Sequence, residues 1–208
     1  LYTGGCNLKC PYCHSRDLVY LKENRYPIVT EKINEYLESH RKDLDGIYIS
    51  GGEPLMHEGV VSFLKYAKTL NYNIKLHTNG MYYDRLCKII HEKLVDSISL
   101  DIKNAPSAYA QTCGVEDIDL NEIEKSLRLL KTSHVPFDLC VTLVNEFHNE
   151  KNIEELGQWI QGVHMVILQP FQDNETTIDH SLHRPDEKQI LKYKTILEKY
   201  VDTVKIRG

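Results

Sequence analysis

The most informative stretch of the chain is a cysteine-rich run near its beginning, Gly4-Gly5-Cys6-Asn7-Leu8-Lys9-Cys10-Pro11-Tyr12-Cys13-His14. Its cysteines have the spacing C-x3-C-x2-C. A 4Fe–4S cluster normally takes four thiolates, so three thiolates leave one iron with an open position for a substrate or cofactor. The alternative is a zinc site, with His14 as the fourth ligand of a Cys3His set. The three-residue gap between Cys6 and Cys10 favours iron–sulfur over zinc.

A second motif stands at the end of an apolar run. Residues 47–50 read Ile-Tyr-Ile-Ser, and Gly51-Gly52-Glu53-Pro54 follow directly. Paired glycines at the end of a strand leave backbone groups uncovered, so a ligand can approach them closely. Glycine and proline mark turns in many proteins, but beside the cysteine triplet this loop indicates a specific binding site.

The composition excludes several functional classes. The chain has 208 residues, of which 41% are hydrophobic, and we expect one globular domain over residues 1–208. The net charge is −5 with scattered Lys and Arg, which argues against a nucleic-acid partner. There is no run of about 20 apolar residues and no secretory signal, so no membrane partner is expected. Because the chain starts at Leu1 in what looks like the tail of a strand, we expect some N-terminal sequence to be absent. Cluster thiols need a reducing compartment, which predicts the cytoplasm.

Strand-length apolar runs alternate with helical patterns along the whole chain. The runs are rich in Ile, Val and Leu, which is typical of parallel strands covered on both faces. Strands are predicted at residues 1–3, 46–50, 73–78, 95–101, 136–144 and 163–168, with 204–208 as a candidate edge strand. Helices are predicted at 30–41, 58–70, 83–93, 121–133, 153–161 and 186–200, with Thr30 and Asp186 as N-caps. A full (β/α)8 barrel uses about 31 residues per unit, so this α/β chain predicts a partial, TIM-like (β/α)6 barrel.

The candidate motifs follow the predicted strands in order. In barrel enzymes the active site lies at the carboxyl ends of the strands. The cysteine run follows the first strand, Gly51-Gly52 the second, Thr78-Asn79-Gly80 the third and Asp101-Ile102-Lys103 the fourth. We therefore expect these segments to meet at one edge of the sheet, with Asp101 and Lys103 on the same side of their strand.

The other three cysteines show no ligand spacing. Cys87 and Cys140 fall in apolar periodic patterns, so we expect both to be small buried hydrophobes. Cys113 lies in a Gln-Thr-Cys-Gly stretch that predicts a loop. We expect no second cluster.

Together, the cysteine triplet and the Gly-Gly-Glu-Pro loop resemble the radical S-adenosylmethionine (radical SAM) superfamily. The resemblance implies an oxidoreductase with one 4Fe–4S cluster on Cys6, Cys10 and Cys13. It also implies that SAM binds the open iron and is cleaved by one electron to a 5′-deoxyadenosyl radical. The cofactor-binding residues it implies are Tyr12 near the adenine, Lys103 at the SAM carboxylate, and the backbone of Gly51 and Gly52 at the methionyl amino group. Asp101 accepts from that amino group or from a bound cation, and Glu53 shapes the loop. Thr78 and Asn79 complete the implied set.

Within the superfamily, the chain is similar to activating enzymes of glycyl radical enzymes. The similarity rests on Thr78-Asn79-Gly80 and Leu100-Asp101-Ile102-Lys103. It is greatest to activators of anaerobic (class III) ribonucleotide reductase, through the run Tyr2–His14 and the closing Lys205-Ile206-Arg207-Gly208. It implies a glycyl radical enzyme as partner and a low-potential electron donor such as flavodoxin or ferredoxin. The alternatives are an activator of pyruvate formate-lyase, a small-molecule enzyme similar to 7-carboxy-7-deazaguanine synthase, and a zinc or electron-carrier module.

Two positions depart from the formate-lyase activators. These carry an aspartate before Thr-Asn-Gly that helps to bind a monovalent cation, and here the residue is His77. Hard cations prefer oxygen ligands, so His77 argues against the cation site, although Thr78 and Asp101 retain oxygens. Gln169-Pro170-Phe171-Gln172 stands where those activators carry a histidine. Both departures point toward the reductase type or an unassigned activator.

Overall fold

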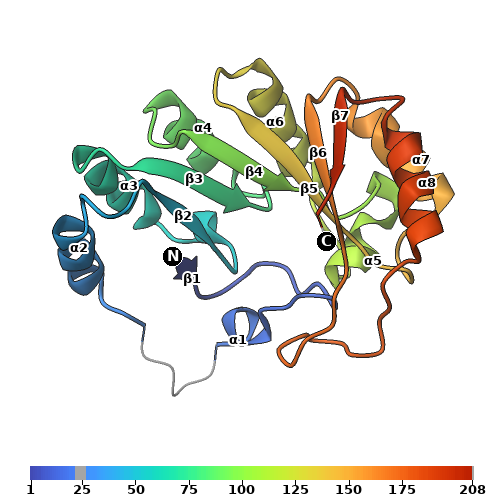
Figure 1. Ribbon diagram of the computed structural model, residues 1–208, viewed down its shortest axis with the longest axis horizontal. Helices are drawn as coiled ribbons and strands as arrows, with labels where there is room; N and C mark the ends of the chain where they lie inside the picture. Colours follow the sequence, from blue (N-terminus) through green and yellow to red (C-terminus); the bar gives the residue numbers. More distant parts are fainter. Residues whose placement is uncertain (22–26, 208) are drawn as a thin grey trace.

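The computed structural model describes residues 1–21 and 27–207. Within them, the strands form one parallel sheet whose spatial order follows the chain, β1 to β7. The strands are β1 (Tyr2–Thr3), β2 (Gly46–Gly51), β3 (Asn73–Thr78), β4 (Ser97–Asp101), β5 (Phe137–Leu143), β6 (Met165–Pro170) and β7 (Thr203–Ile206). Over the described residues the sheet curves but does not close, because its two outer strands, β1 and β7, do not pair with each other (Figure 1). This open α/β barrel confirms the predicted fold, and β7 confirms the candidate edge strand, whose last predicted residue, Gly208, lies outside the described residues.

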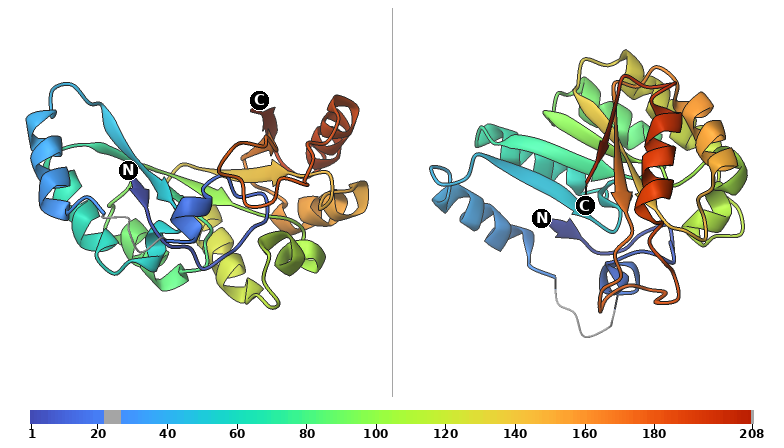
Figure 2. Two further views of the ribbon diagram at one scale, coloured as in Figure 1. Left: turned by 90° about the horizontal axis from the view of Figure 1, so that it is seen from below. Right: turned by 45° about the vertical axis from the view of Figure 1, so that its right-hand side comes forward.

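Helices cover the outer side of the sheet, whereas the segment after β1 and the segment after β6 cross its open side (Figures 1 and 2). The α-helices are α1 (Arg16–Val19), α2 (Thr30–Ser39), α3 (Val60–Thr69), α4 (Tyr83–His91), α5 (Tyr109–Cys113), α6 (Leu120–Thr132), α7 (Glu150–Ile160) and α8 (Glu187–Leu197). The 3-10 turns are η1 (Pro54–Met56) and η2 (Pro106–Ala108). Over residues 1–21 and 27–207, none of these helices has the length and apolar character needed to cross a bilayer.

The sheet separates an apolar core from a polar inner face. On β3, Ile74 and Leu76 are fully buried, whereas the alternate residues Lys75 and His77 are only partly buried. This alternation follows from the two-residue period of a strand, which sends successive side chains to opposite faces. The inner face therefore carries charged and polar side chains, and these reach the site at the strand ends.

The predicted strands lie within two residues of the observed ones, and the predicted helices within three. The short helices α1 and α5 were not predicted. Asp186 is confirmed as an N-cap, because its side chain accepts a hydrogen bond from the Gln189 backbone at 2.7 Å. The Thr30 N-cap is wrong: Thr30 is the first residue of α2, and the extended residue Val29 precedes it without a side-chain cap.

Candidate functional site

The cysteine loop, residues 4–15, lies between β1 and α1 and is fixed by backbone hydrogen bonds to three distant segments. Glu53 N–H donates to Gly5 C=O at 2.9 Å, Lys9 N–H to Cys113 C=O at 3.1 Å, and Ile178 N–H to Cys13 C=O at 3.2 Å. These bonds tie the loop to the end of β2, to the end of α5 and to the segment after β6. The fold therefore positions the loop before any ligand binds.

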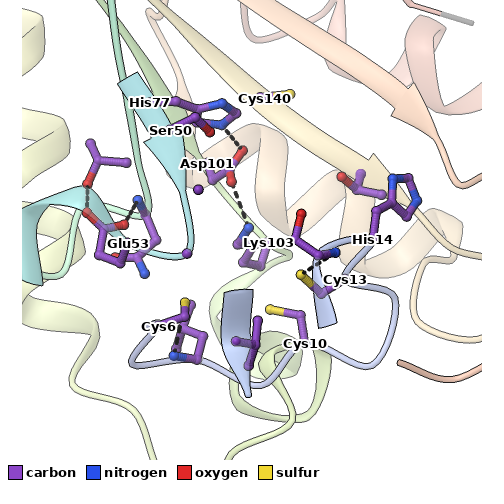
Figure 3. Close-up of a pocket in the computed structure, with 18 of the residues that line it drawn as sticks. Cys6, Cys10, Cys13, His14, Ser50, Glu53, His77, Asp101, Lys103 and Cys140 are labelled. Atoms are coloured by element: carbon purple, nitrogen blue, oxygen red, sulfur yellow. Dashed lines mark hydrogen bonds and ion pairs between the residues drawn. The ribbon is translucent and has the colours of Figure 1, made fainter. Parts of the chain in front are cut away.

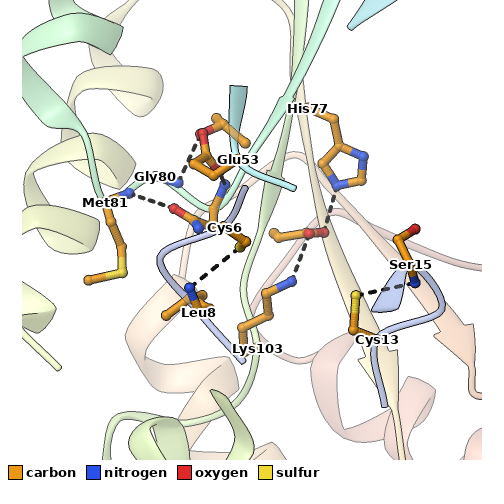
Figure 4. Close-up of polar contacts among 12 residues, drawn as sticks. Cys6, Leu8, Cys13, Ser15, Glu53, His77, Gly80, Met81 and Lys103 are labelled. Carbon is orange, nitrogen blue, oxygen red and sulfur yellow. Dashed lines mark hydrogen bonds and ion pairs between the residues drawn. The ribbon is translucent and has the colours of Figure 1, made fainter. Parts of the chain in front are cut away.

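The three predicted cluster ligands open on one pocket at the strand ends (Figure 3). The Cys6 Sγ accepts from the Leu8 N–H, and the Cys13 Sγ from the Ser15 N–H, both at 3.4 Å (Figure 4). Burial raises the pKa of Cys6 to about 11. Because thiolates bind iron, a metal and nearby N–H donors must favour the ionised form that burial opposes. Three thiols in one loop, with N–H donors to sulfur, fit an iron–sulfur cluster.

The zinc alternative finds little support in the geometry. Within residues 1–21 and 27–207, no three side chains of the types His, Cys, Asp and Glu converge closely enough to hold a single ion. His14, the predicted fourth zinc ligand, packs its ring against Phe171 at 5.8 Å between centroids.

The paired glycines after β2 are needed where the cysteine loop passes. A Cβ on Gly52 would lie 1.9 Å from the Gly5 carbonyl oxygen, and one on Gly51 would lie 2.3 Å from the Thr3 nitrogen. Gly51 also has a φ of +127°, which favours glycine. Both glycines line the pocket, and their contact with the amino group of SAM stays a prediction.

Glu53 joins two loops through a buried carboxylate. It accepts hydrogen bonds from Leu55 N–H at 2.9 Å, the Thr78 hydroxyl at 2.7 Å and Asn79 N–H at 2.7 Å. Burial raises the pKa of Glu53, and these three donors oppose that shift. The Asn79 side chain in turn donates to Asn7 Oδ1 at 2.8 Å. Glu53, Thr78 and Asn79 therefore hold the strand-end loops and the cysteine loop together.

A chain of polar contacts runs from β2 to the end of β4. The Asp101 carboxylate accepts from His77 Nε2 at 2.7 Å and from Lys103 Nζ at 2.8 Å. On the other side of the ring, His77 Nδ1 lies 2.5 Å from the Tyr48 hydroxyl. Burial opposes ionisation of Asp101, but the charges of His77 and Lys103 outweigh it and hold the pKa of Asp101 far below its usual range. Burial also lowers the pKa of Lys103, but Asp101 raises it well above its usual value.

The same contacts involve Asp101 and Thr78, the two oxygen-bearing residues that remain at the cation site against which His77 argues. Each Asp101 oxygen already accepts a hydrogen bond from a basic side chain. The Thr78 hydroxyl donates to Glu53 and accepts from Gly80 N–H at 3.2 Å. The oxygens of Asp101 and Thr78 are therefore engaged within the protein.

Tyr12 is 4% exposed and forms part of the pocket wall, with its ring 6.2 Å from that of Phe147. Its contact with adenine stays a prediction. Gln169, at the end of β6, also lines the pocket. All the residues predicted to bind the cluster or SAM are thus brought to one place.

The expectations for the remaining cysteines hold only in part, since Cys140 is buried as predicted. Cys87 is only partly buried on α4, with its sulfur 3.6 Å from His91 Nδ1. Cys140 is buried, but it lies opposite Asp101 in the strand register and lines the pocket instead of the apolar core. Cys113 ends α5, and its hydrogen bond with Cys10 lowers the pKa of Cys10 below its usual value. The apolar periodicity did not distinguish the core from the pocket wall.

Sequence reasoning also missed His148, whose ring forms a hydrogen bond with the backbone of Lys103. Its Nδ1 accepts from Val144 N–H at 3.1 Å, so its Nε2–H donates to the Lys103 carbonyl at 3.1 Å. Burial lowers the pKa of His148 to about 4, which keeps the ring neutral. No spacing or motif in the sequence connects His148 with Lys103.

Comparison with known proteins agrees with this geometry. The model of the radical SAM superfamily matches residues 1–160. A Methanocaldococcus jannaschii protein with the provisional name glycyl-radical enzyme activating enzyme is 29% identical over all of this chain, which covers 87% of that protein. A GTP 3′,8-cyclase of Alkaliphilus metalliredigens is 27% identical over 74% of this chain and 49% of its own length.

Among solved structures, Streptococcus suis SuiB bound to S-adenosylmethionine matches all of this chain with a TM-score of 0.76, over 49% of SuiB and at 14% identity. At that identity the likeness shows the fold alone. The superfamily model covers well over half of the sequence. The chain belongs to the radical SAM superfamily.

Proposed function

We propose that the chain is an activating enzyme that cleaves SAM reductively and forms a glycyl radical on a partner protein. The observation that carries this proposal is that three thiols, a glycine loop and the Asp101–Lys103 pair open on one pocket. A 4Fe–4S cluster, when bound, supplies one electron and an open iron position. Cys6, Cys10 and Cys13 would hold it as thiolates.

The protein residues bind and orient SAM. The Lys103 ammonium pairs with the SAM carboxylate, because a charge-assisted hydrogen bond is stronger than a neutral one. The backbone of Gly51 and Gly52 lies against the methionyl amino group, and Tyr12 lies beside the adenine. The buried Glu53 keeps the glycine loop in place through its three hydrogen bonds.

A protein substrate is favoured by two observations. Over the described residues β1 and β7 do not pair with each other, so the barrel is open on the side where we place the loop of another chain. The M. jannaschii relative carries the name of an activating enzyme of glycyl radical enzymes and matches this chain over its whole length. The first candidate partner is an anaerobic ribonucleotide reductase, with flavodoxin or ferredoxin as electron donor. A radical at a glycine Cα is stabilised by delocalisation over the flanking amides.

A second candidate is a radical SAM enzyme that acts on a small molecule. The observation in its favour is the match to a GTP 3′,8-cyclase over 74% of this chain. That match covers 49% of the cyclase, so the likeness leaves about half of that enzyme without a counterpart. The two candidates differ in what stimulates SAM cleavage.

The test uses anaerobically reconstituted protein, SAM and a strong reductant. We expect about four iron and four sulfide per chain and formation of 5′-deoxyadenosine. A peptide with the glycyl-loop sequence of an anaerobic ribonucleotide reductase, deuterated at the glycine Cα, should transfer deuterium to deoxyadenosine. The matched control is the same peptide with alanine in place of glycine. One zinc per chain, or stimulation by GTP without deuterium transfer from the peptide, would contradict the proposal.

A further inference from the structure

The pocket contains an arrangement of charges that SAM binding alone does not explain, and the inference drawn from it rests on the function proposed above. We name His77, Asp101 and Lys103 the pocket group. His77 lies on β3, and its Nδ1 lies 2.5 Å from the Tyr48 hydroxyl. Its Nε2 lies 2.7 Å from Asp101 Oδ1 (Figure 3). Lys103 Nζ contacts the other carboxylate oxygen at 2.8 Å. One carboxylate is thus shared by two basic side chains.

The charge of the pocket group depends on the imidazole. With a neutral ring, Asp101 and Lys103 cancel, and the ammonium is bound to a full counter-charge. With a protonated ring, one carboxylate faces two cations, and the group presents a net positive charge to the pocket. An anionic ligand group gains from the second state, because partly buried charges are weakly screened.

The surroundings of His77 favour the protonated state. Burial lowers the pKa of His77, but the charge of Asp101 and its hydrogen bond outweigh burial, so the pKa is raised above its usual value. Lys103 opposes this shift and Glu53 assists it. The titratable groups around the ring are Tyr48 on β2, Glu53 after β2, Asp101 and Lys103 at the end of β4, and Cys140 on β5. The pKa values of Tyr48 and Cys140 are raised by burial to about 12, so both stay neutral near pH 7.

We propose that His77 is a positioning residue whose imidazolium shares the Asp101 carboxylate with Lys103, so that the Lys103 ammonium is presented to the carboxylate group of SAM with excess positive charge. His77 touches no reacting atom in this role. It acts through Asp101, and the contact between the Tyr48 hydroxyl and Nδ1 fixes the orientation of the ring. The bound proton thereby supplies positive charge to the pocket group from within the chain.

The chain offers a matched control on the same strand. We name Lys75, Ser99 and Asp138 the strand group. Lys75 Nζ lies 2.8 Å from Asp138 Oδ2, and the Ser99 hydroxyl donates to Asp138 Oδ1 at 2.6 Å. Lys75 lies two residues before His77 and does not line the pocket. It therefore contributes a charge to the inner face without contacting the SAM site.

The experiment measures the SAM dissociation constant of the reconstituted protein from pH 5.5 to 8.5, for the natural chain, His77→Gln and Lys75→Gln. The protonated form binds better, so affinity should be full below the His77 pKa and fall as pH rises through it. We expect His77→Gln to bind about tenfold more weakly at low pH, the scale of one charge-assisted interaction, and to show a flat profile. Lys75→Gln should keep the natural profile.

A second measurement does not depend on any variant folding. Nitrogen-15 NMR of the natural protein should show both ring nitrogens of His77 protonated at pH 6.5, because the pKa of His77 is raised above its usual value. A neutral ring at pH 6.5, or a natural pH profile that persists in His77→Gln, would overturn the role of His77. Natural protein that binds no SAM at any pH would instead contradict the proposed function, and SAM binding with a flat profile would contradict only this inference.

Discussion

The pocket group and the strand group are built alike on neighbouring strands, yet they differ in charge and in surroundings. In each, a carboxylate on the inner face accepts two hydrogen bonds from side chains of nearby strands or strand ends. The strand group pairs one carboxylate with one ammonium and a hydroxyl, and its Lys75 side chain is 36% exposed. In the pocket group the Lys103 side chain is 14% exposed, and a second basic residue is present.

The number of basic side chains around the carboxylate distinguishes an ion pair at a ligand site from one that only stabilises the fold. When one cation and a neutral donor bind a carboxylate, its charge is balanced and its hydrogen bonds are satisfied within the protein. Such a carboxylate contributes to the fold. A carboxylate matched by two basic groups leaves positive charge directed at a pocket, and pKa shifts of this kind gather at functional sites. An ion pair on an inner barrel face is therefore not sufficient evidence of function.

The largest contrast should come from removing each carboxylate in turn. Asp101→Asn leaves Lys103 buried without a counter-charge, which costs about 3–5 kcal/mol when one partner of a buried pair is lost. Asp138→Asn should cost about 1 kcal/mol, because solvent screens Lys75. Chemical denaturation followed by circular dichroism gives both free energies of unfolding. Equal losses in the two variants would remove the distinction between the groups.

The next contrast concerns the two lysines. Lys103→Ala should weaken SAM binding by about 1.5–3 kcal/mol, the scale of a hydrogen bond to a charged group. Lys75→Ala should leave SAM binding unchanged, since Lys75 does not line the pocket. Equilibrium dialysis with labelled SAM on cluster-loaded protein measures both. An unaltered dissociation constant for Lys103→Ala would assign this lysine to structure alone.

The smallest effect is expected at His77 itself when the charge is reversed. His77→Asp replaces a cationic donor with two oxygens beside Asp101, so the two carboxylates should require sodium or potassium between them. We expect SAM cleavage by the natural protein to vary little across a series of monovalent cations, and by the variant to depend on them. Strong potassium dependence in the natural protein would show that its imidazole does not replace a metal cation.

The sequence predicted the sheet well because Ile, Val and Leu recur along most strands, either in runs or in alternation with polar residues. The 73–78 prediction coincides with β3, and motifs at successive strand ends were correctly brought to one edge. Asp101 and Lys103 were placed on the same side by alternation, and the contact at 2.8 Å agrees with that. Contacts between residues at one strand end can be predicted from the sequence, because the local geometry of the strand determines them.

Contacts between different strands could not be predicted from the sequence in this way. His77 pairs with Ser99 in the β3–β4 register and reaches Asp101 diagonally, and no pattern in the sequence specifies that register. The approach of Cys113 to Cys10 joins segments more than 100 residues apart in the sequence. The support of Lys103 by His148 depends on how the segment after β5 turns back. Each is a tertiary contact between residues whose local patterns are ordinary.

The central claim is that the three cysteines of one loop hold the cluster at which SAM is cleaved. The most direct measurement is iron content and 5′-deoxyadenosine formation after anaerobic reconstitution of Cys13→Ala, with Cys87→Ala as the matched control outside the pocket. Cys13 is chosen because Cys10 forms a hydrogen bond with another cysteine, Cys113, whereas the Cys13 thiol bonds to the Ser15 backbone. We predict that Cys13→Ala loses most of its iron and all SAM cleavage, whereas Cys87→Ala keeps both. Undiminished deoxyadenosine formation by Cys13→Ala would contradict the claim.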